Sequence, residues 1–549
     1  MRRAEIGLAL AAALVFLGGL GARDFWEPDE PRHGAIAEEM RELRYGPGQL
    51  IIPRLNGEPY SQKPPLYYWL AAGAGASGGF VTEGAARLPS AIAGLLTVLV
   101  VYRFGRSAFG PVAGLAAGAI LVTVPAFVDI ARNARPDALL TLFITAALFA
   151  CWRIDRSLGD AAWNRRALHL AMGLGILTKG PLAVLLPLLG FAVYLAWERR
   201  LRDFGALFSR GSWLLSVGTA AAWLGPALWI APGGFFRDAV TENLFARYFA
   251  GTTHEQPFFF YLKRLPVALL PWALLWPFAL APIRAGLGRD ADPDRRRVLR
   301  LLLAFVGTGF IFLSLSAGKR VIYLLPLIPP LALLSTEGLR GALPLARRLP
   351  RGAAAGLLAA SGALGLALLA AFAGTRAGLP PTAVGIALVA AAALVALPWE
   401  RLFGTEPIVA RGFVLAVAAQ VAVFAWFLPR LDPSHSIRAT AVTAAAFAPE
   451  GTPIGLVRNG SMVGGIAYYS GRPVVALGGE KAVARFVAAG GRAVILETPH
   501  LPALAKRLRP RIVFRQEVEE NEILVIVIDD PRAVADATLP PMGREGDGS

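Results

Sequence analysis

A short stretch near the N-terminus places three carboxylates beside an arginine and a histidine. Residues 26–33 read Trp-Glu-Pro-Asp-Glu-Pro-Arg-His, so Asp29 and Glu30 closely precede Arg32. Carboxylates of this kind can take a proton from an incoming hydroxyl or stabilise positive charge that develops at a carbon. The alternative role is structural, because acidic residues favour the start of a helix. Asp29 and Glu30 are therefore candidate catalytic acids, and Arg32 is a candidate ligand for an anion.

A second candidate acid, Asp137, follows Arg132 and Arg135 at the start of an apolar run. A carboxylate inside a membrane costs up to roughly 3 kcal/mol unless it faces a cavity or a partner. A helix cap paired with Arg135 would explain Asp137 structurally, and a catalytic role would explain it functionally. Asp137 joins the candidate acids on this ground.

Residues 53–65 contain features of a phosphate site. Pro64 and Pro65 follow Lys63 and suit the first turn of a helix, where backbone N–H groups already favour an anion. Lys63 at such a helix start is a candidate phosphate ligand, and Arg54 supplies a second cation from the same stretch.

Lysine is rare among the 55 basic residues, and all lysines fall in segments that we assign to the outer side of a membrane: Lys63, Lys179, Lys263, Lys319, Lys481 and Lys506. Because lysine and arginine are not equivalent donors, the retained lysines indicate positions where a compact charge matters. Lys319 and Arg320 place two cations at one outer junction of apolar runs. Snorkelling of their long side chains is the simpler explanation, and binding of an anionic partner is the functional one.

Apolar residues make up 55% of the chain and charged residues only 17%, whereas about a quarter of the residues of a soluble protein are charged. The sequence therefore predicts an all-helical membrane bundle of about thirteen spans, each of roughly 20 residues. The expected spans are 6–22, 86–102, 110–127, 137–152, 167–178, 180–197, 212–231, 264–283, 299–316, 321–338, 353–373, 381–398 and 412–428.

The net charge of +17 follows from topology and requires no nucleic-acid partner. With the N-terminus in the cytoplasm, most arginines of the short loops fall on the cytoplasmic side, as the positive-inside rule predicts. This orientation places the candidate acids and cations on the periplasmic face of a bacterial inner membrane. The single cysteine, Cys151, excludes an intrachain disulfide. We expect the first apolar run to be retained as a span.

Two long segments interrupt the pattern of short loops within the expected membrane domain, 1–433, and two further segments follow this domain. Residues 23–85 are expected to form helices in the membrane interface around a cavity. Residues 232–262 form a second outer loop, in which His254 and Glu255 could bind a metal with a third ligand. Residues 434–530 alternate strand-like and helix-like runs, which predicts a small periplasmic α/β domain. The tail 531–549 is expected to be disordered.

These motifs resemble the aminoarabinose transferases that modify lipid A, within the wider superfamily of protein O-mannosyltransferases with the GT-C fold. The resemblance rests on Asp29-Glu30-Pro31-Arg32, Pro53-Arg54-Leu55-Asn56-Gly57-Glu58-Pro59-Tyr60, Lys63-Pro64-Pro65-Leu66-Tyr67-Tyr68-Trp69-Leu70, Arg87-Leu88-Pro89-Ser90, Arg135-Pro136-Asp137, Thr178-Lys179-Gly180-Pro181 and Gly318-Lys319-Arg320-Val321-Ile322-Tyr323-Leu324-Leu325-Pro326. It covers residues 20–330 by motif and the remainder by architecture.

The resemblance implies an inverting glycosyltransferase with an undecaprenyl-phosphate sugar donor and a periplasmic acceptor such as lipid A. It implies that Asp29 and Asp137 are functional acids and that Lys63 contacts the carrier phosphate. Arg247 and Tyr323 would contact the same phosphate, and His254 would match a divalent metal site. No nucleotide cofactor is expected, because nucleotide sugars are absent outside the cytoplasm and an activated donor must arrive on a lipid.

Two departures leave the sugar and the acceptor open. His33 stands where the resemblance predicts Tyr, and Arg44–Ile52 is longer than usual. A mannosyltransferase-like enzyme acting on protein or another envelope glycan is therefore an alternative. A flippase for a lipid-linked sugar is a third reading, but transporters usually show repeated halves and interrupted spans near the midplane. This chain instead concentrates its polar groups at one face. A non-catalytic scaffold, in which these clusters are incidental, is the remaining alternative.

Overall fold

The computed structural model describes residues 2–239, 241, 255–346 and 407–528. Packing divides the chain into two compact units. The membrane unit comprises Met1–Arg23 and Ala37–Arg430, and the C-terminal unit comprises Asp24–Ile36 and Leu431–Ser549. Residues 24–36, which the sequence analysis grouped with the membrane domain, therefore pack with the C-terminal unit, and each unit is described separately below.

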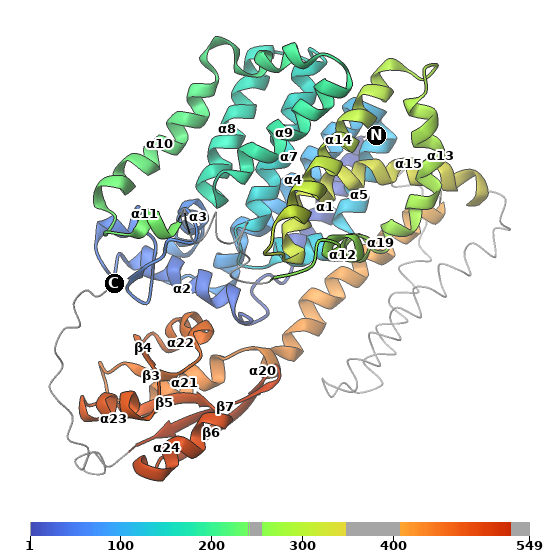
Figure 1. Ribbon diagram of the computed structural model, residues 1–549. Helices are drawn as coiled ribbons and strands as arrows, with labels where there is room; N and C mark the ends of the chain where they lie inside the picture. Colours follow the sequence, from blue (N-terminus) through green and yellow to red (C-terminus); the bar gives the residue numbers. More distant parts are fainter. Residues whose placement is uncertain (1, 240, 242–254, 347–406, 529–549) are drawn as a thin grey trace. The chain divides into compact units, whose positions relative to one another are not determined.

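The membrane unit is built from apolar helices (Figure 1). Six of its described segments are long and apolar enough to cross a membrane, or eight if each of two bent helix pairs is one span, so the protein is a multi-pass membrane protein. The expected spans 353–373 and 381–398 lie outside the described residues, and the total of about thirteen stays a prediction. The main helices are α1 (Arg2–Leu17), α3 (Leu66–Ala76), α4 (Glu83–Phe109), α5 (Pro111–Val122), α6 (Pro125–Arg132), α7 (Asp137–Asp155), α8 (Ala161–Lys179), α9 (Leu182–Trp197), α10 (Trp213–Ile230), α12 (Phe260–Ala268), α13 (Trp276–Leu287), α14 (Pro293–Leu315), α15 (Ile328–Ala346) and α19 (Pro407–Ala422).

Two bends interrupt the helical bundle, and one hydrogen bond joins them. Helices α5 and α6 meet at 64°, where Pro125 begins a new helix. Helix α12 and the segment Trp272–Leu287 meet at 98°. The Trp272 indole Nε1 donates to Thr123 Oγ1 over 2.9 Å. The Trp272 indole at one bend and the Thr123 hydroxyl at the other therefore satisfy each other's hydrogen-bonding groups within an apolar unit.

Buried arginines anchor the end of α1. Arg87, only 1% exposed on α4, donates to the carbonyls of Leu20 and Arg23 at 3.1 and 2.7 Å. Arg132 donates to the carbonyls of Val15 and of Gly18, the latter at 2.7 Å. Val15 belongs to the last turn of α1, where carbonyls lack partners within the helix and favour cations, whereas Leu20 and Arg23 lie just beyond the end of the helix at Leu17. These two guanidinium groups therefore fix where the chain leaves the first helix.

The segment after α1 contains α2 (Asp29–Glu42), η1 (Pro47–Leu50), and the two-residue strands β1 (Arg54–Leu55) and β2 (Glu58–Pro59), paired antiparallel. The hairpin turns at Asn56 and Gly57, whose φ angles are 54° and 86°. Positive φ at both central residues is the condition for a type I′ turn, which Asn-Gly adopts readily. Helix α3 follows directly after Pro65, as the proline pair predicted.

The C-terminal unit contains the predicted α/β arrangement. Its five strands run in the order β4-β3-β5-β7-β6, parallel across β4, β3 and β5 and antiparallel from β5 to β7 and β6. The strands are β3 (Ile454–Val457), β4 (Val474–Leu477), β5 (Ala493–Glu497), β6 (Arg511–Val518) and β7 (Asn521–Val527), and the helices are α20 (Asp432–His435), α21 (Arg438–Phe447), α22 (Val463–Ser470), α23 (Glu480–Ala488) and α24 (Leu501–Leu508).

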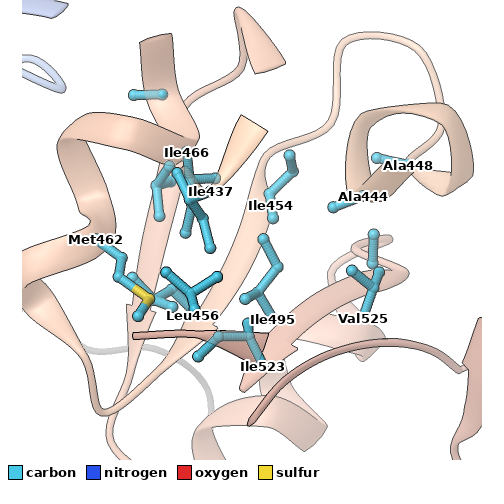
Figure 2. Close-up of a cluster of buried hydrophobic side chains, with 14 residues drawn as sticks. Ile437, Ala444, Ala448, Ile454, Leu456, Met462, Ile466, Ile495, Ile523 and Val525 are labelled. Carbon is cyan, nitrogen blue, oxygen red and sulfur yellow. The ribbon is translucent and has the colours of Figure 1, made fainter. Parts of the chain in front are cut away.

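Alternating apolar side chains give this sheet two buried faces. On one face, Leu456, Ile495 and Ile523 pack against side chains of α21 and α22 (Figure 2). On the other face, Val494 and Leu524 pack with residues of α23 and α24. The period of two along each strand explains why neighbouring residues of one strand enter different cores.

Removal of the Arg87 guanidinium tests the anchor of α1. Arg87→Ala should lower the free energy of unfolding by about 3 kcal/mol, because a buried carbonyl and a partly buried carbonyl lose a charged donor. Thermal unfolding in detergent measures the change. Arg103→Ala, an exposed arginine on the same helix, is the control and should unfold like the unmodified protein. Equal unfolding temperatures for both variants would contradict this role of Arg87.

Candidate active site

Asp137 and Lys179 are brought together by two neighbouring antiparallel helices. Asp137 is the first residue of α7 and Lys179 is the last residue of α8. The start of a helix favours an anion and the end of a helix favours a cation, so both side chains stand where the backbone supports their charge. The Lys179 ammonium contacts Asp137 Oδ1 directly. Asp137 is 6% exposed, which makes this a buried ion pair.

Further cations surround the Asp137 carboxylate. Arg135 Nε lies 3.8 Å from Asp137 Oδ2. The Lys63 ammonium donates to the Gln62 carbonyl at 3.0 Å and lies near enough to act electrostatically on the Asp137 carboxylate. Lys179 and Arg135 therefore pair with this acid, and Lys63 adds a third positive charge nearby. Such a group attracts an anion with more than one charged oxygen, as phosphate has. The structure thus places the predicted phosphate ligand Lys63 with the predicted acid Asp137.

Tyr323 faces Lys179 from a different element. Its ring centroid lies 5.1 Å from the Lys179 ammonium, a cation–π distance. Tyr323 belongs to η5 (Val321–Leu327), which precedes α15. Tyr323 and Asp137 therefore both contact Lys179, which belongs to one of the family-like motifs but was not predicted as a site residue. Its signal was the rarity of lysine in a chain rich in arginine.

The loop before Asp137 is held by α4. The Ser90 hydroxyl donates to the carbonyl of Arg135 at 2.6 Å, and the Arg135 N–H lies 3.4 Å from Ser90 Oγ. Because Arg87 of the same helix anchors the end of α1, the motif Arg87–Ser90 serves two neighbouring segments. These positioning contacts were not predicted from the sequence.

The hairpin before Lys63 is tied to the buried acid Glu39 of α2. The Asn56 N–H donates to Glu39 Oε1 at 2.7 Å. Burial raises the pKa of Glu39 to about 7, and the N–H groups of Asn56 and Gly57 oppose this rise. Arg54, a predicted phosphate ligand, donates to the Gly57 carbonyl at 2.6 Å and thereby closes the same turn.

Lys319 and Arg320 lie in the connection between α14 and η5. The Lys319 ammonium is 4% exposed and donates to the carbonyls of Ser316 and of Gln256, the latter at 2.8 Å. The Arg320 carbonyl accepts the Tyr261 hydroxyl at 3.1 Å. Lys319 thus joins two stretches of backbone, and its proposed contact with a donor phosphate stays a prediction.

Asp29, Glu30 and Arg32 lie in the C-terminal unit. Arg32 Nη1 pairs with Asp29 Oδ1 at 3.3 Å, and Glu30 Oε2 lies 3.4 Å from the N–H of Trp26. Asp29 and Glu30 are 9% and 4% exposed. Asp29 therefore belongs to a different unit from Asp137, and each acid has its own basic partners.

Glu27 is a buried acid that the sequence analysis did not single out. Both of its carboxylate oxygens are buried without a hydrogen-bond partner. Burial raises the pKa of Glu27 to about 8, and Arg32 opposes this rise. Glu27 is therefore mostly protonated at neutral pH.

Arg247 and His254, predicted to bind phosphate and metal, lie outside the described residues. Among the residues that the structure does describe, His, Cys, Asp and Glu side chains form no group of three that could hold a metal ion. The metal site stays a prediction, and the proposed transfer of the sugar does not depend on it.

Comparisons with known proteins confirm the resemblance. Residues 62–229 match the family described as dolichyl-phosphate-mannose-protein mannosyltransferase. The chain is 33% identical over 347 residues to the undecaprenyl phosphate-alpha-4-amino-4-deoxy-L-arabinose arabinosyl transferase of Pseudomonas aeruginosa, a match that covers 60% of this chain and 59% of that protein. The chain therefore spans about three fifths of the length of the curated relatives it matches.

The fold is that of ArnT from Cupriavidus metallidurans. The crystal structure of that protein bound to undecaprenyl phosphate gives a TM-score of 0.72 at 22% identity, and the match covers 95% of this chain and 97% of that one. Its apo structure gives 0.74 at 20% identity, with 96% and 98% covered. The predicted membrane bundle with a small C-terminal α/β domain, the GT-C-type architecture, is thus confirmed as the fold.

The acid that holds the hairpin should make stability depend on pH. The pKa of Glu39 rises from 4.5 to about 7 on folding, so the folded chain binds this proton more tightly than the unfolded chain. The stabilisation that protonation of Glu39 contributes is present in full below about pH 4.5 and is lost as the pH rises through about 7. Glu39→Gln should therefore flatten the pH dependence of the unfolding temperature between pH 5 and pH 8.

The exposed hairpin acid Glu58 provides the matched control. Glu58→Gln should keep the pH dependence of the unmodified chain when unfolding is followed in detergent. A Glu39→Gln profile parallel to that of the unmodified chain would show that Glu39 does not titrate in this range.

Proposed function

We propose that this protein is an inverting glycosyltransferase that transfers 4-amino-4-deoxy-L-arabinose from undecaprenyl phosphate to lipid A. Its site would face the periplasm, in the inner membrane of a bacterium. The observation that carries the proposal is the group of cations around Asp137. The activity for which the relatives are named supports the donor, and the distribution of arginine supports the orientation.

Lys63, Arg135 and Lys179 would hold the phosphate of the lipid-linked donor. During transfer, the bond between the anomeric carbon and the phosphate oxygen breaks, and its electron pair leaves on the phosphate. Cations already in place stabilise the charge that accumulates there and need not reorganise during the reaction. The C–O bond to the acceptor forms from the opposite face of the sugar, which accounts for inversion.

The two acids would have different tasks. Asp137 is occupied by Lys179 and Arg135, so we assign it to holding these cations in place and to stabilising positive charge at the sugar carbon. Asp29, which the resemblance implies is a functional acid, would accept the proton of the acceptor hydroxyl. Glu30 lies next to Asp29 in the first turn of α2 and would support the acidic character of this segment.

The match to mannosyltransferases supports a second candidate acceptor. Residues 62–229 contain Lys63, Arg135, Asp137 and Lys179, and this range matches a family named for mannose transfer to protein. The phosphate-binding group would then serve a polyprenyl-phosphate donor with a different sugar. The two candidate functions differ in the acceptor, so the mass of the sugar is added to lipid A in one case and to protein in the other.

Mass spectrometry of lipid A tests the proposal directly. Cells that express the full chain should show lipid A carrying an added pentosamine, whereas cells expressing Asp29→Asn or Asp137→Asn should not, because each substitution removes a carboxylate required by the mechanism. Membrane fractions probed for each variant confirm that the protein is present. Glu58→Gln removes an exposed acid of strand β2 and should retain transfer.

Two results would contradict the proposal. Unmodified lipid A in cells with the active chain, together with a hexose on envelope proteins, would favour the mannosyltransferase-like alternative. Full modification in both aspartate variants would remove the assigned roles of these acids.

A further inference from the structure

The C-terminal unit encloses the segment that carries Asp29. The Phe25 N–H donates to the Tyr469 hydroxyl at 2.7 Å. Asp432 accepts the Asp24 N–H at 2.9 Å and the Trp26 indole N–H at 2.7 Å. The backbone on the N-terminal side of Asp29 is therefore fixed to α22 and α20 by directed hydrogen bonds.

Aromatic contacts reinforce these hydrogen bonds. The Phe25 ring packs 4.9 Å from Tyr468, and the Trp26 ring stacks 4.4 Å from His435. Rings at these distances contribute stabilisation beyond the area they bury. Segment 24–28 is thus held by both backbone and side-chain contacts immediately before α2 begins at Asp29.

Two adjacent glycines of α22 bring this helix against the first turn of α2. A Cβ atom on Gly464 would lie 2.6 Å from Arg32 Cα and 2.8 Å from Arg32 N, both of which are backbone atoms. A Cβ atom on Gly465 would overlap the carboxylate of Glu27. A backbone clash cannot be relieved by side-chain rotation, so a larger residue at 464 must push the first turn of α2 away.

We propose that Gly464 is a positioning residue through which the C-terminal unit sets the location of Asp29. Arg32 lies one helical turn after Asp29 and pairs with it at 3.3 Å, so displacement of the Arg32 backbone also moves the acid and its partner. The inference rests on the proposed function and extends it, because it gives the C-terminal unit a task in the reaction. Glu27 supports the arrangement as a neutral carboxyl group packed over Gly465.

The test compares Gly464→Ala with Gly460→Ala in the purified full-length chain, using an undecaprenyl-phosphate-linked aminoarabinose donor and lipid A. A Cβ atom on Gly460 would meet no atom within 4 Å, so this variant is a matched control on the same connection. Gly464→Ala should lower kcat by about 100-fold, since displacements on the order of 1 Å at a reacting group have effects of this size. KM for the donor should stay unchanged, because Lys63, Arg135 and Lys179 lie in the membrane unit.

A second arm places Gly464→Ala in the Asp29→Asn background. If Gly464 acts through Asp29, the double variant should show the same residual rate as Asp29→Asn alone. A further loss of similar size in the double variant would overturn the inference, as would a kcat for Gly464→Ala equal to that of Gly460→Ala. Full transfer by Asp29→Asn would instead reject Asp29 as an acid and thereby the proposed mechanism, so the two failures are distinguishable.

Tyr469→Phe covers the case in which Gly464→Ala does not fold. This variant removes only the hydroxyl that accepts the Phe25 N–H and keeps the ring contacts. It should also lower kcat with unchanged KM for the donor, by a smaller factor. An unchanged kcat in a folded Tyr469→Phe variant would overturn the inference.

Discussion

The pairing of Asp137 with Lys179 is the interaction around which the proposed phosphate site is built. A carboxylate buried at a membrane boundary requires a cation close by, because loss of its hydration is not otherwise offset. The antiparallel packing of α7 and α8 supplies this cation from the end of one helix to the start of the other. Once the pair is formed, Arg135, Lys63 and Tyr323 can gather around it, and the group becomes attractive to an additional anion.

Hydrogen bonds from the surrounding structure fix the backbone segments that carry or adjoin the residues around this pair. Ser90 holds the carbonyl of Arg135, and Arg87 holds the chain as it leaves α1. Glu39 holds the hairpin that precedes Lys63. Each restraint acts on backbone groups, which move less than side chains do. The proposed phosphate site would gain from such preorganisation, because less conformational freedom is lost on binding. In the C-terminal unit, glycines and aromatic rings perform the same task for Asp29.

Much of this organisation could be predicted from the sequence, and the reasons for the omissions are physical. Long apolar runs predicted a membrane bundle of helices, and the alternation of strand-like and helix-like runs predicted the small C-terminal α/β domain. The helix start after Pro65 was predicted from the proline pair, whereas the Asn56–Gly57 turn agrees with local backbone preferences but was not predicted. By contrast, Asp137 and Lys179 are separated by 42 residues, and only helix packing brings them together. Arg54 and Lys319 were predicted to bind an anion, yet both donate to backbone carbonyls. Residue type alone does not reveal such a structural role. The packing of residues 24–36 with the C-terminal unit depends on contacts with α20 and α22, which no local pattern in the sequence indicates.

We propose that the cations around Asp137 bind the phosphate of a polyprenyl lipid. Equilibrium binding of undecaprenyl phosphate and of undecaprenol to the full chain in nanodiscs tests this role, because the two lipids differ only in the phosphate. We expect at least about tenfold tighter binding of undecaprenyl phosphate, since hydrogen bonds to charged groups contribute about 1.5–3 kcal/mol each, and a smaller difference for Lys63→Ala. Equal affinities for the two lipids in the unmodified chain would contradict it.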